Sequence, residues 1–181
     1  MPAEKEMDAV ALLKADHRKV EELFEKFESA KGESAKQKLA QQICMELAIH
    51  TRIEEEIFYP ACTGAIEDEE LVQEAYVEHD GAKVLVAEIL AGKPSNEFYD
   101  AKVKVLSEMI KHHVKEEEKR AEGLFAEAKA AGLDMDALGQ QLSERKQELM
   151  AEYKAELPAP ETRSFTGHEL VQGEPIAQQA A

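Results

Sequence analysis

Four histidines lie within the hydrophobic stripes of four different predicted helices, and this feature constrains the fold more than any other. Each histidine continues a series of apolar residues spaced three or four positions apart, which is the spacing of one helix face. The four are His17, His50, His79 and His113. Two of these stripes also carry a glutamate four residues after the histidine, Glu54 and Glu117, so each glutamate shares a face with its histidine.

The hydrophobic pattern and its capping residues predict five helices. The expected ranges are 8–30, 34–59, 67–92, 95–132 and 134–155. Short connections between the first four make neighbouring helices antiparallel. We therefore predict an all-α fold: an up-down-up-down four-helix bundle over 8–132, an additional helix packing on it at 133–157, and an extended or disordered tail at 158–181, where proline and glycine accumulate.

Charge and hydropathy exclude several classes of partner. The chain has 38 acidic and 22 basic residues and a formal net charge of −16. Such an acidic field repels phosphate backbones and anionic lipid, so we expect neither nucleic acid nor membrane as a partner. No apolar run is long enough to cross a bilayer, and residues 1–8 lack the apolar stretch of a secretory signal. These features favour a cytoplasmic protein, whose oligomeric state the sequence leaves open.

The two cysteines agree with a reducing compartment. If one helix continues from Cys44 through Cys62, their separation in sequence corresponds to roughly 27 Å. A disulfide requires Cα atoms within about 7 Å of each other. An intramolecular bridge is therefore not expected, as is usual for a cytoplasmic protein.

Burial of ionisable groups in the core points to a metal. An unpaired carboxylate inside a bundle costs on the order of several kcal/mol, against a net stability of about 5–15 kcal/mol for a whole domain. Two divalent ions would neutralise Glu54 and Glu117 and bind the lone pairs of the four imidazoles. Mixed imidazole and carboxylate donors suit iron, with manganese or zinc as competitors.

Helical periodicity separates these donors from their neighbours. Glu54 and Glu117 are expected to point inward, whereas the adjacent Glu55, Glu56 and Glu118 are expected to face solvent or neighbouring helices. Consecutive helical residues diverge by about 100°, so His112 and His113 cannot both face the core. His113 continues the apolar stripe and is the predicted donor. The alternative pairs His112 with Glu117.

The order of the donors resembles one family of bundles. The Glu-x-x-His motif of ferritin-like proteins is absent from the core histidines, since Leu47, Tyr76 and Ile110 occupy the preceding positions. Over about residues 8–130 the chain resembles the hemerythrin family in its HHE cation-binding branch. The matching segments are Ala15-Asp16-His17-Arg18, His50 to Pro60, Glu78-His79-Asp80, and His112 to Glu118.

The resemblance implies a non-haem di-iron centre that binds or reacts with oxygen, peroxide or nitric oxide. It implies terminal histidine ligands at His17, His50, His79 and His113, with Glu54 and Glu117 bridging the irons. Two departures weaken a simple oxygen-carrier interpretation. Lys83 stands where oxygen carriers have a second histidine, and the family's Phe-Pro after the last motif is missing.

Two alternative functions are consistent with the same residues: a catalase- or peroxidase-like enzyme at the same centre, and an iron-sensing or sequestering protein without turnover. Tyr59 and Tyr76 could hydrogen-bond a ligand, but the sequence favours packing roles for both. His168, in the predicted tail, is expected to be solvated.

Overall fold

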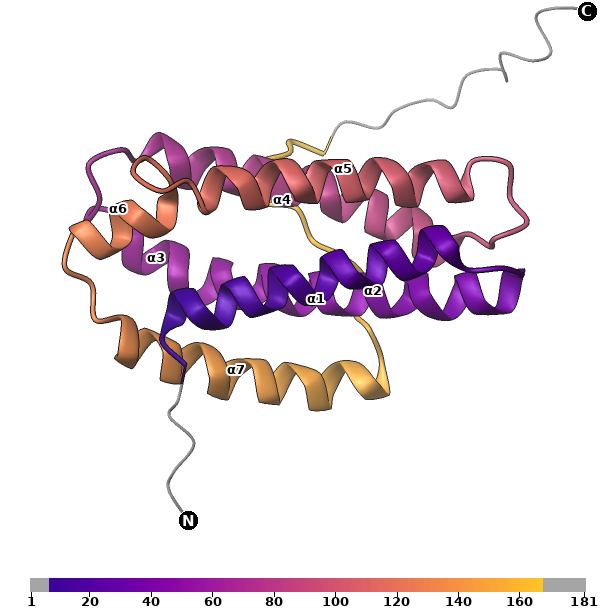
Figure 1. The fold of residues 1–181 in the computed structure, drawn as a ribbon, viewed down its shortest axis with the longest axis horizontal. Coiled ribbons are helices and arrows are strands. Elements are labelled where there is room, and N and C mark those ends of the chain that lie inside the picture. Colours follow the sequence, from indigo (N-terminus) through magenta and orange to yellow (C-terminus); the bar gives the residue numbers. More distant parts are fainter. Residues whose placement is uncertain (1–6, 168–181) are drawn as a thin grey trace, which may run out of the picture.

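The computed structural model describes residues 7–167, and its four long helices form an up-down-up-down bundle (Figure 1). These helices are α1 (Ala9–Ser29), α2 (Glu33–Ile53), α4 (Glu70–Ala91) and α5 (Tyr99–Glu117). Helix α1 packs against α2 and α5, and α4 packs against the same two helices. The ring of four neighbours confirms the predicted all-α bundle.

Shorter elements extend and flank the bundle. A π-helical turn, η1 (Glu54–Phe58), and the short α3 (Tyr59–Cys62) continue α2 without a break. After α5 come α6 (Leu124–Ala130) and α7 (Met135–Ala155). Helix α7 packs outside the bundle on α1 and α2, as the predicted additional helix does. The division into units 8–132, 133–157 and 158–181 stays a prediction, and residues 168–181 of the tail, with His168, lie outside the described residues.

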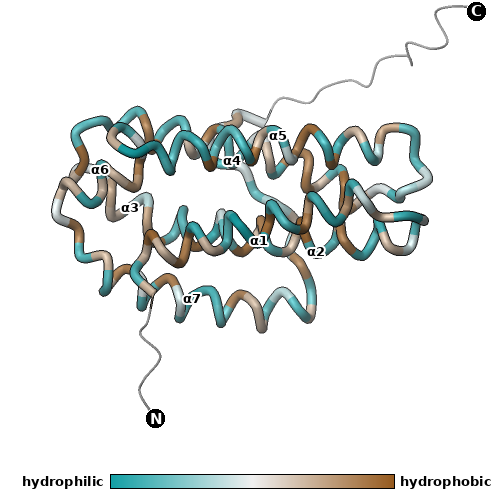
Figure 2. Tube along the Cα trace, viewed as in Figure 1, coloured by the Kyte–Doolittle hydropathy of each residue, from teal (hydrophilic) through white to brown (hydrophobic). Residues whose placement is uncertain are grey.

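The core is divided into two hydrophobic clusters. One lies toward α3, α6 and α7 and includes Leu13, Ile53, Phe58, Leu124 and Leu142. The other lies toward the α1–α2 and α4–α5 connections and includes Phe24, Leu47, Val86, Leu106 and Ile110. Along each long helix, hydrophobic residues recur among hydrophilic ones (Figure 2). Each helix therefore has a hydrophobic face, and these faces form the two clusters. The buried histidines and glutamates are in the part of the bundle between them.

Pro60 does not end the second helix, which was predicted to stop at Tyr59. The Tyr59 N–H bonds to the Glu54 carbonyl, five residues back, as in a π-helix. Pro60 lacks the N–H that would continue this pattern to the Glu55 carbonyl, but the Tyr76 hydroxyl lies 3.5 Å from that carbonyl oxygen. Pro60 also occupies the first turn of α3, where proline is tolerated. The helix therefore continues to Cys62.

The predicted fourth helix, 95–132, is in fact two helices. Helix α5 ends at Glu117, and α6 begins at Leu124 after a connection made of turns. Gly123 makes this compact connection possible. A Cβ at this position would lie 2.6 Å from the Glu117 carbonyl oxygen and from the Lys119 nitrogen. The periodic stripe from Leu106 to Leu124 did not reveal the break, because both halves are hydrophobic on one face.

The predicted starts of helices are confirmed where an aspartate caps the helix. Elsewhere the observed starts differ from the predicted ones. Asp8 and Asp134 accept hydrogen bonds from the N–H groups of Ala11 and Ala137. Helix α2 begins at Glu33, directly after Gly32, which has a φ of 88°. Helix α4 begins at Glu70 rather than at 67 or 68, after a turn in which the Glu70 N–H bonds Asp68.

Two further expectations can be compared with the structure. None of the helices between residues 7 and 167 combines the length and the apolar character needed to span a bilayer. Cys44 and Cys62 are both buried free thiols, as expected. Burial raises the pKa of each thiol to about 12, so neither is a thiolate near neutral pH.

Candidate metal centre

All six predicted donors meet in the buried layer between the two hydrophobic clusters. Their residues are at most 4% exposed. Helix α1 supplies His17, α2 and η1 supply His50 and Glu54, α4 supplies His79, and α5 supplies His113 and Glu117. Each of the four bundle helices thus contributes, because each stripe faces the common axis.

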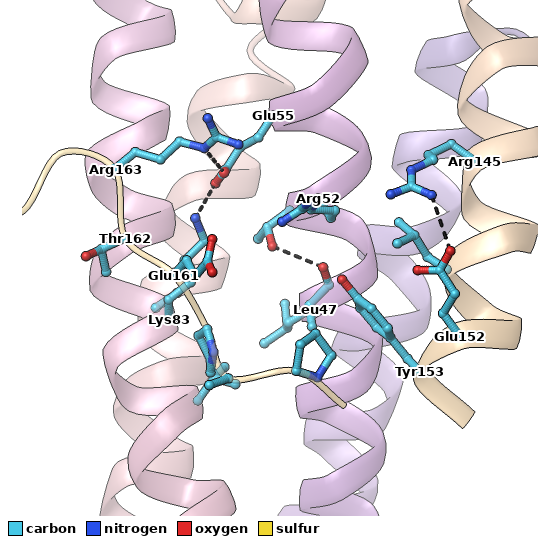
Figure 3. A pocket seen from close by; sticks show the side chains of 18 residues that line it. Leu47, Arg52, Glu55, Lys83, Arg145, Glu152, Tyr153, Glu161, Thr162 and Arg163 are labelled. Carbon is cyan, nitrogen blue, oxygen red and sulfur yellow. Dashed lines mark hydrogen bonds and ion pairs between the residues drawn. The ribbon is translucent and has the colours of Figure 1, made fainter. Parts of the chain in front are cut away.

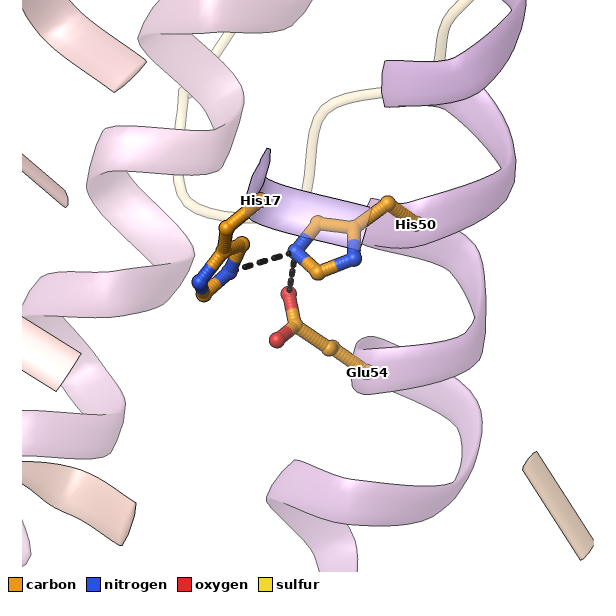
Figure 4. Close-up of side chains that lie close together, drawn as sticks. All are labelled: His17, His50 and Glu54. Atoms are coloured by element: carbon orange, nitrogen blue, oxygen red, sulfur yellow. Dashed lines mark hydrogen bonds and ion pairs between the residues drawn. The ribbon is translucent and has the colours of Figure 1, made fainter. Parts of the chain in front are cut away.

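The donors form two groups of three that share Glu54. One group is His17, His50 and Glu54, and the other is Glu54, His79 and His113. Within each group the potential ligand atoms lie within 4.8 Å of one another. Figure 4 shows the first group, with the two imidazoles and the carboxylate converging on one point. The facing Nε2 atoms are 3.0 Å apart in the first group and 3.2 Å apart in the second.

Both carboxylates lie between the groups. Glu54 Oε2 is 3.2 Å from His50 Nε2 and 3.3 Å from His79 Nε2. Glu117 Oε2 is 3.4 Å from His17 Nε2 and 3.6 Å from His113 Nε2. Each carboxylate therefore contacts one imidazole of each group, which is the placement that a carboxylate shared by two metal ions requires.

Unsatisfied oxygens show that this donor set fits a cation. Glu54 Oε1 and Glu117 Oε2 are buried and have no hydrogen-bond partner among the described residues, a costly condition without a positive charge nearby. Burial, and then repulsion from Glu117, raise the pKa of Glu54 well above its usual range. Burial also acts to raise the pKa of Glu117, but His113 and the other imidazoles hold it below its usual range. A cation would satisfy both oxygens.

A second carboxylate faces the outer nitrogen of each histidine. The Nδ1-to-oxygen pairs are His17–Glu118 at 2.8 Å, His79–Glu55 at 3.1 Å, His113–Glu78 at 2.8 Å and His50–Asp16 at 3.6 Å. A carboxylate at Nδ1 fixes the orientation of a ligand imidazole and makes Nε2 a better donor. Carboxylates thus hold His17, His79 and His113 with Nε2 inward, and Asp16 lies just beyond hydrogen-bond distance of His50.

Sequence reasoning assigned no role to these four acids. Glu55 and Glu118 were expected to face solvent or neighbouring helices, and each contacts a predicted donor on a neighbouring helix. Glu55 is 5% exposed and contacts His79 on α4, and Glu118 contacts His17 on α1. A signal was present, since every one of the four acids is adjacent in sequence to one of the six donors. Periodicity within one helix cannot reveal it, because each of these contacts joins two different helices.

Tyr59 reaches the centre, although the sequence favoured a packing role for it. Its hydroxyl lies 3.0 Å from Glu117 Oε1 and 3.1 Å from His79 Nε2, and its side chain is fully buried. In an α-helix, residues five apart diverge by about 140°. The i→i+5 bonding of η1 brings Tyr59 back toward the face of Glu54. Burial, and then the charges of Glu117 and Glu54, raise the pKa of this phenol well above its usual range.

The two adjacent histidines of α5 differ sharply in environment. His113 is 3% exposed, whereas the side chain of His112 is 65% exposed and contacts Glu78 at 3.4 Å. We expect His113→Ala to lose at least one bound metal ion per chain, because it removes an Nε2 donor. His112→Ala is expected to retain full metal content. Elemental analysis of both variants tests the assignment, and the opposite pattern would establish His112 as the donor.

These features define a class of protein: a four-helix bundle whose interior carries clustered imidazole and carboxylate donors for metal ions. A family model described as the hemerythrin HHE cation binding domain matches residues 8–125. The chain belongs to this family, which confirms the resemblance seen in its motifs and identifies the protein as a metal-binding one.

Two relatives illustrate the match. A crystal structure of a hemerythrin HHE cation binding domain-containing protein from Mycobacterium kansasii aligns with a TM-score of 0.68 at 22% identity, covering 85% of this chain and 95% of that one. This likeness shows the fold. A DNA nickase from Nostoc sp. (strain PCC 7120) is 29% identical over 113 residues, which are 62% of this chain. The chain spans 32% of the nickase's length.

Proposed function

We propose that this chain is a non-haem di-iron protein of hemerythrin type that binds or reacts with oxygen, peroxide or nitric oxide. The observation that carries the proposal is the pair of donor groups sharing Glu54 inside one buried layer. Six protein donors for two ions leave coordination positions for an external ligand. Iron is the proposed metal, with manganese and zinc as competitors for the same donors.

The space around the donors supports the smallest ligands. A void of about 10 Å³ adjoins the four imidazoles and is otherwise lined mainly by aliphatic side chains of Val20, Leu47, Ile110 and Val114. A space of this size holds about one water molecule. Oxygen, nitric oxide and hydrogen peroxide are of comparable size, whereas an organic substrate would require the bundle to open.

The chain's own residues would set the conditions for that chemistry. Bound iron supplies reversible one- and two-electron chemistry with oxygen species. The aliphatic lining excludes bulk water and lowers the local dielectric, which strengthens the contacts made by the donors. The outer carboxylates hold the imidazoles in place. The Tyr59 hydroxyl, which burial keeps protonated near neutral pH, would supply a hydrogen-bond donor beside the metal ligands.

Tyr59 also favours a second candidate, peroxide consumption of the catalase or peroxidase type. A phenol that contacts both Glu117 and His79 is placed to move protons during cleavage of an O–O bond. The third candidate, iron sensing or sequestration without turnover, requires the donor set alone.

The match to a nickase does not lead us to propose a nucleic-acid substrate for this chain. Its formal net charge of −16 opposes binding to a phosphate backbone. We propose that the two proteins share the metal-binding bundle. The match covers 32% of the nickase, and the rest of that protein lies outside it.

Metal analysis combined with ligand challenge tests the proposed function. Protein loaded anaerobically with iron is expected to contain close to two equivalents per chain, and one tight equivalent or none would contradict the dinuclear centre. Exposure to air or nitric oxide is then expected to change the visible spectrum. Oxygen evolution from hydrogen peroxide would favour the enzyme, and two irons that respond to none of the three reagents would favour sequestration.

A further inference from the structure

The chain segment after α7 crosses the outside of the bundle and reaches α4 (Figure 1). We call residues 157–164 the C-terminal strap. Apart from Leu157, it belongs to the region that the sequence predicted as an extended or disordered tail. In the structure its last two residues, Arg163 and Ser164, contact two buried acids that lie beside the donors.

The first of these acids is Asp80, which follows His79 in sequence and is fully buried. Its Oδ2 accepts hydrogen bonds from the Arg163 N–H at 2.8 Å, the Ser164 N–H at 2.5 Å and the Ser164 hydroxyl at 2.7 Å. Three donors from two consecutive residues converge on one oxygen. The end of the strap is thereby fixed to the turn of α4 that carries a predicted metal ligand.

The second acid is Glu55, the residue that faces the outer nitrogen of His79. Its Oε1 lies 3.1 Å from His79 Nδ1, and its Oε2 accepts a hydrogen bond from Arg163 Nε at 2.9 Å. Arg163 therefore holds one oxygen of the carboxylate whose other oxygen orients the imidazole.

Charge balance shows that the strap completes this cluster. Glu55 and Asp80 are 5% and 0% exposed, and both contact the Lys83 ammonium, at 2.6 and 3.2 Å. One lysine cannot neutralise two buried carboxylates, and Arg163 is the second cation that contacts the cluster. Lys83, the departure from the oxygen-carrier pattern, is thus part of the support of His79 together with Arg163.

The strap has little apolar packing of its own. A cavity of about 490 Å³ lies beneath it, bounded by α2, α4 and α7 (Figure 3). Most strap residues are exposed, and only Leu157 and Pro160 are partly buried. Because the strap spans the cavity rather than filling it, the polar contacts of Arg163 and Ser164 are what attach it to α4.

We propose that Arg163 and Ser164 are positioning residues of the metal centre, acting through Glu55 and Asp80 to hold His79 in place. The inference rests on the proposed function, since it assigns His79 as a metal ligand. Loss of Arg163 leaves Glu55 Oε2 without its fixed partner and the two buried acids with one cation. The carboxylate then holds His79 less firmly, and the metal is released more easily.

The test compares Arg163→Gln and Ser164→Ala with the control Arg145→Gln in the full chain. Arg145 lines the same cavity, but it contacts Glu56, Glu148 and Glu152 and none of the six donors. Removing an outer partner of a metal ligand typically weakens binding by about 10- to 100-fold. We expect Arg163→Gln to release iron to a chelator about tenfold faster than the unmodified protein, Ser164→Ala to show a smaller increase, and Arg163→Lys to restore most of the loss. Equal release rates for Arg163→Gln and Arg145→Gln would overturn the proposal.

A measurement on metal-free protein separates this proposal from the proposed function. The nitrogen-15 resonances of the His79 side chain are expected to shift in Arg163→Gln and to stay unchanged in Arg145→Gln. If the unmodified protein binds no iron but the resonances shift as expected, the proposed function fails and the positioning of His79 stands. Unchanged His79 resonances in Arg163→Gln would refute the positioning role whatever the iron content.

Discussion

Glu54→Gln is expected to empty the metal centre and, at the same time, to raise the melting temperature of the metal-free protein. Both donor groups include Glu54, so the substitution removes an anionic donor from each. A neutral amide is a far weaker ligand for iron than a carboxylate. Elemental analysis after iron loading should therefore fall from about two equivalents to less than one.

The stabilising effect follows from the cost of the carboxylate in the absence of metal. Glu54 is fully buried, its Oε1 has no hydrogen-bond partner in the described chain, and burial and Glu117 raise its pKa. Replacing this buried carboxyl by a neutral amide removes the cost of ionising it in the core, a penalty of on the order of 1–3 kcal/mol. In a chain of this size, each 1 kcal/mol shifts the melting temperature by roughly 2–4 °C, so an increase of several degrees near pH 7.5 is expected.

Glu46→Gln is the matched control, because it makes the same substitution at a buried residue of α2 that makes no hydrogen bond or ion pair with any of the six predicted donors. The Glu46 side chain is 8% exposed and pairs with Lys19 at 2.6 Å. This variant is expected to keep both iron ions and to melt at or slightly below the unmodified protein. A Glu54→Gln protein that retains two irons, or whose metal-free form melts lower than the unmodified metal-free protein, would show that Glu54 is not a shared buried donor.

The sequence singled out the six predicted donors because each lies on a periodic apolar stripe, and the bundle turns such stripes toward one axis. That argument depends on regular helices. It failed at Tyr59, because η1 changes the rotation per residue, and at Gly123, where α5 ends although the stripe continues. Helical periodicity indicates which residues share one face of a regular helix, but it does not detect a local change of the backbone hydrogen-bond pattern.

The contacts around the donors were beyond the sequence for a different reason. Glu55 and Glu78 contact histidines 24 and 35 residues away, and Arg163 contacts Glu55 at a separation of 108 residues. Side chains that meet across helices depend on register and rotation, which composition and spacing do not fix. The strap was predicted as tail because its prolines and polar residues lack periodicity, yet four hydrogen bonds from Arg163 and Ser164 to buried acids hold it in place.

Iron loading is expected to raise the melting temperature by an amount that increases with pH between about 5 and 7.5. In the metal-free protein the pKa of Glu54 is raised by burial and by Glu117, so the folded state binds this proton more tightly than the unfolded chain. Its contribution to stability is present below the unfolded value of 4.5 and is lost as the pH rises through the folded value.

The contribution of His79 to stability changes with pH in the opposite direction. Burial lowers its pKa to about 4 from 6.5, so the unfolded chain takes up the proton first and stability increases as the pH rises from about 4 to 6.5. Below that range, protonation of the unfolded chain opposes folding, and any proton on an imidazole or carboxylate donor opposes metal binding. Above it, the His79 contribution is constant, whereas stability is still lost as the pH rises through the raised pKa of Glu54. Bound metal removes this loss, because it neutralises the carboxylate.

The difference between loaded and metal-free protein should therefore be largest at the upper end of the pH range. A ligand present at about a thousand times its dissociation constant stabilises the folded state by about 4 kcal/mol, which corresponds to roughly 8–16 °C here. Thermal unfolding of both forms near pH 5.5, 6.5 and 7.5 measures the trend. The control is Glu54→Gln, because added iron should have little effect on its melting temperature at any pH. Coincident melting curves at pH 7.5, or a difference that shrinks as the pH rises, would mean that the buried donors are not neutralised by a bound cation. Charge neutralisation is the physical basis of the proposed centre, so this titration examines it independently of any reaction with oxygen.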